Sequence, residues 1–286
     1  GIIRCALGPR ASATKYQGLT RRQWGAYQEY TIAPASTTFP IPDNTSFEDA
    51  STLPLAAMTA VLGLFVKLGI PAPGSAEAAS NAGKALIING ASSSVGAFTV
   101  QLAKRAGLFV VGIAGASKAY AVELGADAIV DYREHKSEAD LIQAIVAATA
   151  GRPTPWGYDA ISGDGTTLVL ARALAELNRD GHAKLTFLNP ASDAEAKQTP
   201  ATVVAVRTYV GTAYAEDEEF AAKYYRQISQ WLADKDTPFV GNRVKIMPGG
   251  LDDVAEGLNL LKENKVHGEK LVYCIADTRS LKSSAA

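Results

Sequence analysis

The stretch ALIINGASSSVGAFTVQLAKRAG, residues 85–107, decides the fold. A short apolar run over 85–88 meets a turn of small residues over 89–96, and a helical pattern then continues to Gly107. A strand, a tight turn and a helix in this order are typical of the first unit of a dinucleotide-binding domain. In such a unit the backbone N–H groups of the turn and the positive end of the helix face a pyrophosphate.

The glycine pattern within this turn is incomplete. Counted back from Gly96 in the pattern G-x-G-x-x-G, the first two glycine positions hold Ala91 and Ser93. The turn alone therefore also fits any strand-to-helix junction of a parallel sheet. The hydroxyls of Ser92, Ser93 and Ser94 are further donors that a bound anion would use.

Strand and helix patterns alternate beyond this unit. The predicted strands span residues 85–89, 109–113, 128–131, 158–161, 184–188 and 203–208, and the predicted helices span 95–106, 118–124, 137–150 and 166–177. Short apolar strands between helices indicate parallel βαβ units that are covered on both faces. The predicted fold class is therefore α/β with a doubly wound parallel sheet.

The two ends of the chain have a different character. Residues 25–33 alternate like a strand, and an apolar helix is predicted over 50–67, capped by Ser46 and bent near Pro54. Near the C-terminus we predict a helix with an aromatic packing face over 216–233, a strand over 243–247, a helix over 251–264 and a strand over 269–275.

Composition excludes several classes of function. With 28 basic and 29 acidic residues, the chain has no electrostatic footprint for nucleic acid or for an anionic membrane surface. Its two cysteines, Cys5 and Cys274, lie far apart, which argues against a disulfide scaffold and favours a reducing, cytoplasmic location. The most apolar run, residues 53–66, is shorter than the ~18 residues that a membrane span needs.

The end of the second predicted strand favours NADPH over NADH. An NAD-binding unit usually places an acid about 20 residues beyond the glycine pattern, but residues 110–118 read VVGIAGASK. Ser117 and Lys118 suit a 2′-phosphate instead. The alternative is that Ser117 only caps the next helix and Lys118 faces solvent. After the third strand Tyr132 offers a ring for the adenine, and Leu188 closes the fifth strand at the edge where ligands bind.

Five segments together resemble the medium-chain dehydrogenase/reductase superfamily. Within it the chain is most similar to the zinc-independent quinone and enoyl reductases, including the trans-acting enoyl reductases of polyketide assembly lines. The segments are GAYQEY (25–30), FPIPDNTSFEDASTLPLAAMTA (39–60), NGASSSVGAFTVQLAKRAG (89–107), LGADAIVDYR (124–133) and PGGLDDVAEGLNLLKENKVHGEKLVY (248–273).

The resemblance implies a Rossmann domain and a β-rich, GroES-like catalytic domain. It predicts a partial GroES-like domain over 1–70, an NADP-binding Rossmann domain over 71–235 and a return to the catalytic domain over 236–286. Because the chain begins at Gly1 within the pattern, we expect most of the GroES-like domain to precede it.

The resemblance also assigns residues to the cofactor. It places Ser92, Ser93, Ser94 and Val95 at the pyrophosphate, Ser117 and Lys118 at the 2′-phosphate, Tyr132 beside the adenine, Thr59 and Leu188 at the nicotinamide, and Val266 and His267 in a loop that closes over it. His267 fits a solvated loop histidine equally well. The catalytic proton donor stays unassigned.

The reaction that the resemblance implies is hydride transfer from NADPH to an enone, an enoyl thioester or a quinone, without zinc. The thioester case would bring the acyl carrier of a polyketide synthase as partner. Leu55 stands where zinc-dependent relatives have a cysteine ligand, and the two cysteines cannot form a four-cysteine zinc lobe. A non-catalytic NADPH sensor and a zinc alcohol dehydrogenase are the alternatives, and the protein is expected to be a monomer or a homodimer.

Overall fold

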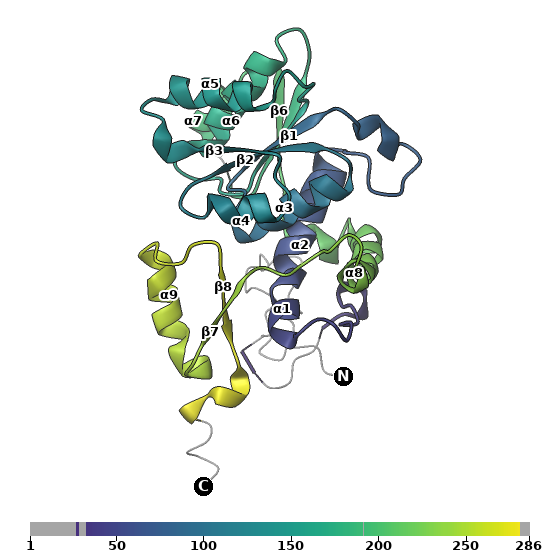
Figure 1. Cartoon of the computed structure of the whole chain (residues 1–286), viewed down its shortest axis with the longest axis vertical. Helices are drawn as coiled ribbons and strands as arrows, with labels where there is room; N and C mark the ends of the chain where they lie inside the picture. Colours follow the sequence, from purple (N-terminus) through teal and green to yellow (C-terminus); the bar gives the residue numbers. More distant parts are fainter. Residues whose placement is uncertain (1–26, 29–32, 191, 281–286) are drawn as a thin grey trace. The chain divides into compact units, whose positions relative to one another are not determined.

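The computed structural model describes residues 27–28, 33–190 and 192–280 (Figure 1). Most of the strand predicted over 25–33, and Cys5, lie outside the described residues. The chain divides into two compact units, one formed by Thr59–Tyr209 and the other by Gly1–Met58 together with Val210–Ala286. The C-terminal segment therefore belongs with the N-terminal one, and the boundaries fall at 58/59 and 209/210 rather than at 70 and 235.

The Thr59–Tyr209 unit is built on a parallel sheet of six strands in the order β3-β2-β1-β4-β5-β6. The strands are β1 (Ala85–Asn89), β2 (Phe109–Ala114), β3 (Ala128–Asp131), β4 (Trp156–Asp159), β5 (Ala183–Phe187) and β6 (Val203–Arg207). This order reverses between β1 and β4, which is the topological switch point of a Rossmann fold. The predicted doubly wound sheet is confirmed.

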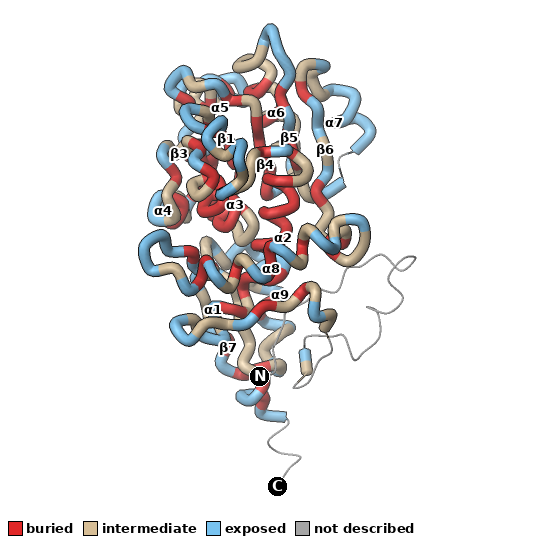
Figure 2. Tube along the Cα trace, turned by 90° about the vertical axis from the view of Figure 1, so that its right-hand side faces the viewer, coloured by how far each residue is buried: buried red, intermediate tan, exposed pale blue. Residues whose placement is uncertain are grey.

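Helices cover both faces of this sheet (Figure 1). They are α3 (Ser94–Arg105), α4 (Lys118–Glu123), α5 (Glu138–Ala148), α6 (Thr166–Leu177) and the short α7 (Asp193–Gln198). Figure 1 shows α3 and α4 on one face and α5 and α6 on the other. The buried residues, red in Figure 2, lie along the strands and on the helices that cover them. One cluster of buried side chains includes Ile87, Val111, Ile145, Leu174 and Leu185. Strands buried on both faces explain the continuous apolar runs of the sequence.

The helix predicted over 50–67 is divided into three parts. They are α1 (Phe47–Ser51), α2 (Leu53–Val61) and a π-helical turn, η3 (Leu62–Lys67). Ser46 caps α1 as predicted, since its Oγ accepts from the N–H of Asp49 at 3.0 Å. Pro54 has no N–H to donate, so the break between α1 and α2 falls beside it.

Four aromatic side chains of the second unit lie on one long helix, α8 (Glu218–Ala233), namely Phe220, Tyr224, Tyr225 and Trp231. Tyr225 stacks on Phe39 with ring centroids 6.3 Å apart, and its hydroxyl donates to the Pro54 carbonyl at 3.0 Å. Ser229 donates to the Pro40 carbonyl at 2.7 Å. These contacts attach α8 to the N-terminal segment. The two therefore fall in one unit, whereas the sequence prediction placed α8 in the Rossmann domain over 71–235.

The remaining elements of this unit are short. They are η2 (Ala35–Thr37), η6 (Val210–Tyr214), β7 (Val244–Met247), η7 (Gly250–Asp253), α9 (Val254–Lys262), β8 (Lys270–Tyr273) and η8 (Ile275–Asp277). Among the described residues, β7 and β8 form the one sheet of this unit, and they run parallel. The assignment of a GroES-like domain to this part of the chain therefore stays a prediction.

Candidate functional site

The turn between β1 and α3 depends on two glycines. Gly90 has φ +71°, a backbone conformation that glycine adopts without strain. A Cβ on Gly96 would lie 2.0 Å from the Gly90 carbonyl oxygen, so the helix could not start this close to the strand with any other residue. Ser93 is the N-cap of α3, and its Oγ accepts from the Gly96 N–H at 3.1 Å. The glycine of the tight turn is thus Gly90. It lies one position before Ala91, where the G-x-G-x-x-G pattern counted back from Gly96 expects the first glycine.

A serine pair joins this turn to the loop after β2. The Ser117 hydroxyl donates to the Ser92 hydroxyl at 2.7 Å. Ser117 precedes α4 but does not cap it through its side chain. The helix-capping alternative for Ser117 is therefore wrong, and the segment carrying Ser117 and Lys118 lies beside the β1–α3 turn.

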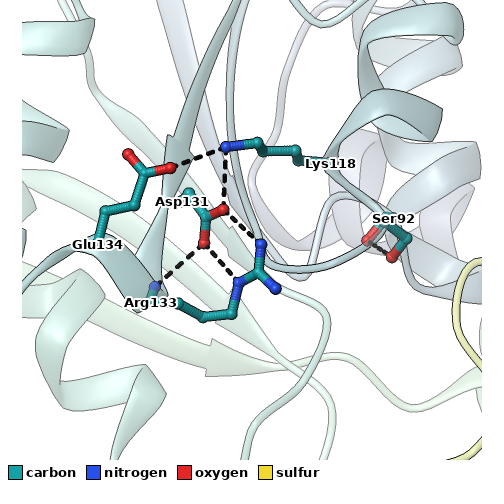
Figure 3. Close-up of polar contacts among 6 residues, drawn as sticks. Ser92, Lys118, Asp131, Arg133 and Glu134 are labelled. Atoms are coloured by element: carbon teal, nitrogen blue, oxygen red, sulfur yellow. Dashed lines mark hydrogen bonds and ion pairs between the residues drawn. The ribbon is translucent and has the colours of Figure 1, made fainter.

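Lys118 lies among charged side chains (Figure 3). Its Nζ is 3.0 Å from a carboxylate oxygen of Asp131 and 2.9 Å from one of Glu134. The Lys118 side chain is thus 43% exposed and ion-paired, and its place at the 2′-phosphate stays a prediction. The strand register explains how Asp131 reaches Lys118, since Asp131 pairs with Ala114 at the end of β2. An acid thus reaches the end of β2 from the neighbouring strand.

The Asp131 carboxylate forms ion pairs with two cationic side chains, Arg133 and Lys118. Its side chain is 3% exposed, and Arg133 grips both oxygens, at 2.9 Å through Nε and 2.7 Å through Nη2. The hydrogen bonds from Arg133 hold the pKa of Asp131 well below its ordinary value, and the hydrogen bonds of Lys118 to Glu134 and Asp131 raise the pKa of Lys118. Asp131 is therefore unlike the acid that accepts from the ribose of NAD, which needs a carboxylate oxygen open to the nucleotide.

Tyr132 presents its ring at the same edge of the sheet. It is 52% exposed and lies in η5 (Tyr132–Glu134) directly after β3. A Cβ on Gly115 would lie 2.8 Å from the Tyr132 ring, so the glycine lets the ring approach the β2–α4 loop. An exposed aromatic ring beside the β2–α4 loop suits a flat heterocycle.

Sequence reasoning missed the acid at the switch point, Asp159. It is completely buried at the end of β4, and the Asn89 amide from the end of β1 donates to it at 2.8 Å. Its oxygens also accept from the backbone N–H groups of Ile161 and Ser162 in the following loop, and from the hydroxyls of Thr166 and Thr167 at the start of α6. The sequence does show that Asn89 ends one predicted strand and that Asp159 lies in another. Their contact could be predicted only by knowing that β1 and β4 are neighbours in the sheet.

The loop that Asp159 organises supports Leu188. Ser162 accepts from the Leu188 N–H at 2.7 Å, and the Leu188 carbonyl accepts from Arg207 Nε at 2.9 Å. The backbone of Leu188 is thereby fixed at the carboxyl edge of β5. Thr59 lies in the same unit, where its carbonyl accepts from the buried Tyr158 hydroxyl at 3.0 Å.

The predicted site residues are divided between the units. Those at the β1–α3 turn, the β2–α4 loop and the ends of β3 and β5 belong with Thr59 to one unit. Val266 and His267 belong to the other unit, and their place at the cofactor stays a prediction. In the described part of the chain, no three His, Cys, Asp or Glu side chains form a group that could hold a metal ion. Within the same residues, none of the helices has both the length and the apolar character that crossing a membrane requires.

Comparison with known proteins agrees with this architecture. A family model described as zinc-binding dehydrogenase matches residues 94–230. The trans-enoyl reductase caaB of Aspergillus niger is 34% identical over an alignment of 274 residues that covers 88% of this chain and 71% of the relative. The chain therefore belongs to the medium-chain dehydrogenase/reductase superfamily, in its enoyl and quinone reductase type.

Solved structures share the fold at low sequence identity. A quinone oxidoreductase of Pseudomonas syringae is 21% identical with a TM-score of 0.64, covering 87% of this chain and 71% of that one. A mycobacterial protein solved in complex with NADPH is 19% identical with a TM-score of 0.66, with coverages of 87% and 71%. These likenesses establish the architecture, while the residue roles rest on the site itself.

Proposed function

We propose that this oxidoreductase uses NADPH. The observation that carries the proposal is the Ser92–Ser117 hydrogen bond, because it holds the segment with Lys118 against the β1–α3 turn. A dinucleotide along this edge would meet Ser92, Ser93, Ser94 and Val95 with its pyrophosphate and Lys118 with its 2′-phosphate. The NADPH complex of the mycobacterial neighbour supports the same cofactor.

The other end of the cofactor would extend along the sheet edge toward β5. Leu188, with its backbone fixed by Ser162 and Arg207, and Thr59 would contact the nicotinamide half. In the other unit, Val266 and His267 are proposed to cover it. Tyr132 would stack on the adenine, an arrangement supported by its exposed ring.

The proposed reaction is reduction of a small-molecule acceptor. NADPH, when bound, supplies the hydride, and the acceptor is an activated C=C in an enone or enoyl thioester, or a quinone. The curated relatives named trans-enoyl reductases support reduction of an enoyl C=C, and the Pseudomonas neighbour, named a quinone oxidoreductase, supports the quinone. For the enoyl case we propose a thioester carried by the acyl carrier of a polyketide synthase. The residues of this chain act by holding the two reactants in register.

The reaction is proposed to run without zinc, despite the description of the family model. Leucine has no atom that ligates a metal, and Leu55 stands where the zinc-dependent relatives have their cysteine. The residues present do not fit that centre, so no step passes through a metal. The low cysteine content supports a cytoplasmic location.

Calorimetric titration with NADPH and with NADH tests the proposal. We expect tighter binding of NADPH, and an NADPH affinity about tenfold or more lower in Lys118→Ala, because a charge-assisted phosphate contact is lost. Lys136→Ala is the matched control, because it replaces an exposed lysine five residues after the end of β3, and it should leave both affinities unchanged. Equal affinities for the two nucleotides would contradict the role of Lys118.

An acceptor screen then separates the candidate reactions. Oxidation of NADPH by enoyl thioesters but not by quinones would establish the enoyl reductase, and the reverse preference would establish the quinone reductase. Binding of NADPH without turnover on any acceptor would favour the alternative of a non-catalytic sensor. Metal analysis of the active protein should find no stoichiometric zinc.

A further inference from the structure

Glu134, the exposed partner of Lys118, bears on the choice between NADPH and NADH. Lys118 contacts two carboxylates of very different surroundings. Asp131 is 3% exposed and held by Arg133 through two parallel hydrogen bonds, whereas the Glu134 side chain is 66% exposed. Asp131 is thus a fixed partner, while Glu134 can leave Lys118 at little cost, because exposed ion pairs are weak.

The charges of this group balance. Lys118 and Arg133 contribute two positive charges, and Asp131 and Glu134 contribute two negative ones, all within one connected set of contacts (Figure 3). A 2′-phosphate brings close to two further negative charges. It therefore meets a locally neutral group, and its attraction to Lys118 is offset by repulsion from Glu134 over a few ångströms.

We propose that Glu134 is a specificity-determining residue that competes with the 2′-phosphate of NADPH for Lys118. The inference rests on the proposed function, since it concerns the same nucleotide site. NADH has a ribose hydroxyl at this position and carries no charge there, so Glu134 penalises NADPH selectively. Asp131 keeps its contact with Lys118 in both cases and orients the ammonium group toward the phosphate. Glu134 thereby reduces the preference for NADPH over NADH that Lys118 creates.

Nucleotide titrations of Glu134→Gln test the proposal. The variant keeps the shape of the side chain and removes its charge, so we expect NADPH to bind about fivefold more tightly at low salt. The affinity for NADH should change by less than about twofold, and raising the ionic strength to 0.5 M should reduce the gain for NADPH, because exposed charges are screened. An unchanged thermal midpoint would establish that the fold is intact.

Glu138→Gln is the matched control. It removes the same charge from an exposed acid four residues further on, which pairs with Arg172 rather than with Lys118. We expect no gain in NADPH affinity from this variant. In a Lys118→Met background, Glu134→Gln should produce no selective gain, since the competition requires the lysine.

Three results would overturn the inference while leaving the proposed function in place. The first is a wild-type preference for NADPH that Lys118→Ala abolishes and Glu134→Gln leaves unchanged. The second is an equal gain in affinity for NADH and NADPH in Glu134→Gln. The third is a gain in NADPH affinity in Glu138→Gln as large as that in Glu134→Gln, which would mark a general charge effect. If folded wild-type protein binds neither nucleotide, the proposed function and the inference both fail.

Discussion

Two buried carboxylates lie at the ends of two strands of the same sheet, β3 and β4, and they are stabilised in opposite ways. Asp131, at the end of β3, is held by the cations Arg133 and Lys118, whose side chains are 49% and 43% exposed. Asp159, at the end of β4, is held by neutral amide, hydroxyl and backbone donors. Cations at the surface can exchange partners with a ligand, whereas neutral donors from the fold itself fix a backbone. The first arrangement suits nucleotide recognition and the second suits a scaffold.

Replacing Asp159 is expected to have the largest effect on stability. Asp159→Asn brings an amide N–H group against donors such as the backbone N–H groups of Ile161 and Ser162. Leaving buried donors without acceptors should lower the free energy of unfolding by about 3 kcal/mol, measured by denaturant titration. Asp164→Asn, in the same loop but exposed, is the control and should change it by less than about 0.5 kcal/mol. Similar losses in both variants would contradict the scaffold role.

Replacing Asp131 is expected to have a smaller effect that depends on pH and salt. The folded-state pKa of Asp131 is lowered by Arg133, so its ionised form stabilises the fold above the ordinary pKa of 3.8. As pH falls below that value, the unfolded chain takes up the proton first, and the advantage of wild type over Asp131→Asn should shrink.

Thermal unfolding between pH 7 and pH 3, at low and high salt, measures this difference. The Asp131→Asn difference should also narrow in salt, because its partners are exposed ions, whereas the Asp159→Asn difference should persist. A salt response that is the same at both positions would remove the distinction between the two carboxylates.

Most of the nucleotide-binding fold was predictable from local patterns. The predicted and observed bounds coincide for β1, β3 and α6, because these are apolar runs or amphipathic segments flanked by turn residues. β4 begins and ends two residues before the prediction over 158–161, since the N–H of Ile161 bonds the Asp159 side chain and not the sheet. The helix α7 was missed, although Ser192 and Glu195 form a capping box that signals its start.

The site was predictable only where it is local in sequence. The β1–α3 turn and the Ser117–Lys118 pair follow strands whose ends can be read directly. The contact of Lys118 with Asp131 depends on the β2–β3 register, and that of Asn89 with Asp159 on the adjacency of β1 and β4. Pairings between strands are set by tertiary packing, which single-sequence periodicity does not encode.

Tyr158 offers a further test of the scaffold side. Its buried hydroxyl donates to the Thr59 carbonyl beside the π-helical turn, where a Cβ on Gly63 would lie 2.3 Å from its ring. Burial raises the pKa of this phenol, which therefore acts as a neutral donor. Tyr158→Phe should lower the free energy of unfolding by about 1 kcal/mol, whereas Tyr132→Phe, on an exposed ring, should leave it unchanged.

The smallest expected effect lies on the nucleotide side, at the serine pair. Ser117→Ala removes the hydrogen bond to Ser92 but no charge, and such a bond between the buried Ser92 and the half-buried Ser117 contributes about 0.5 kcal/mol. The NADPH affinity should fall about twofold, because the segment with Lys118 is then less constrained and loses more conformational entropy on binding the phosphate. The stability of the fold should change little, in contrast with Tyr158→Phe. If Ser117→Ala instead lowers stability and leaves NADPH binding unchanged, the serine pair belongs to the scaffold, and the boundary between the two regions must move to include it.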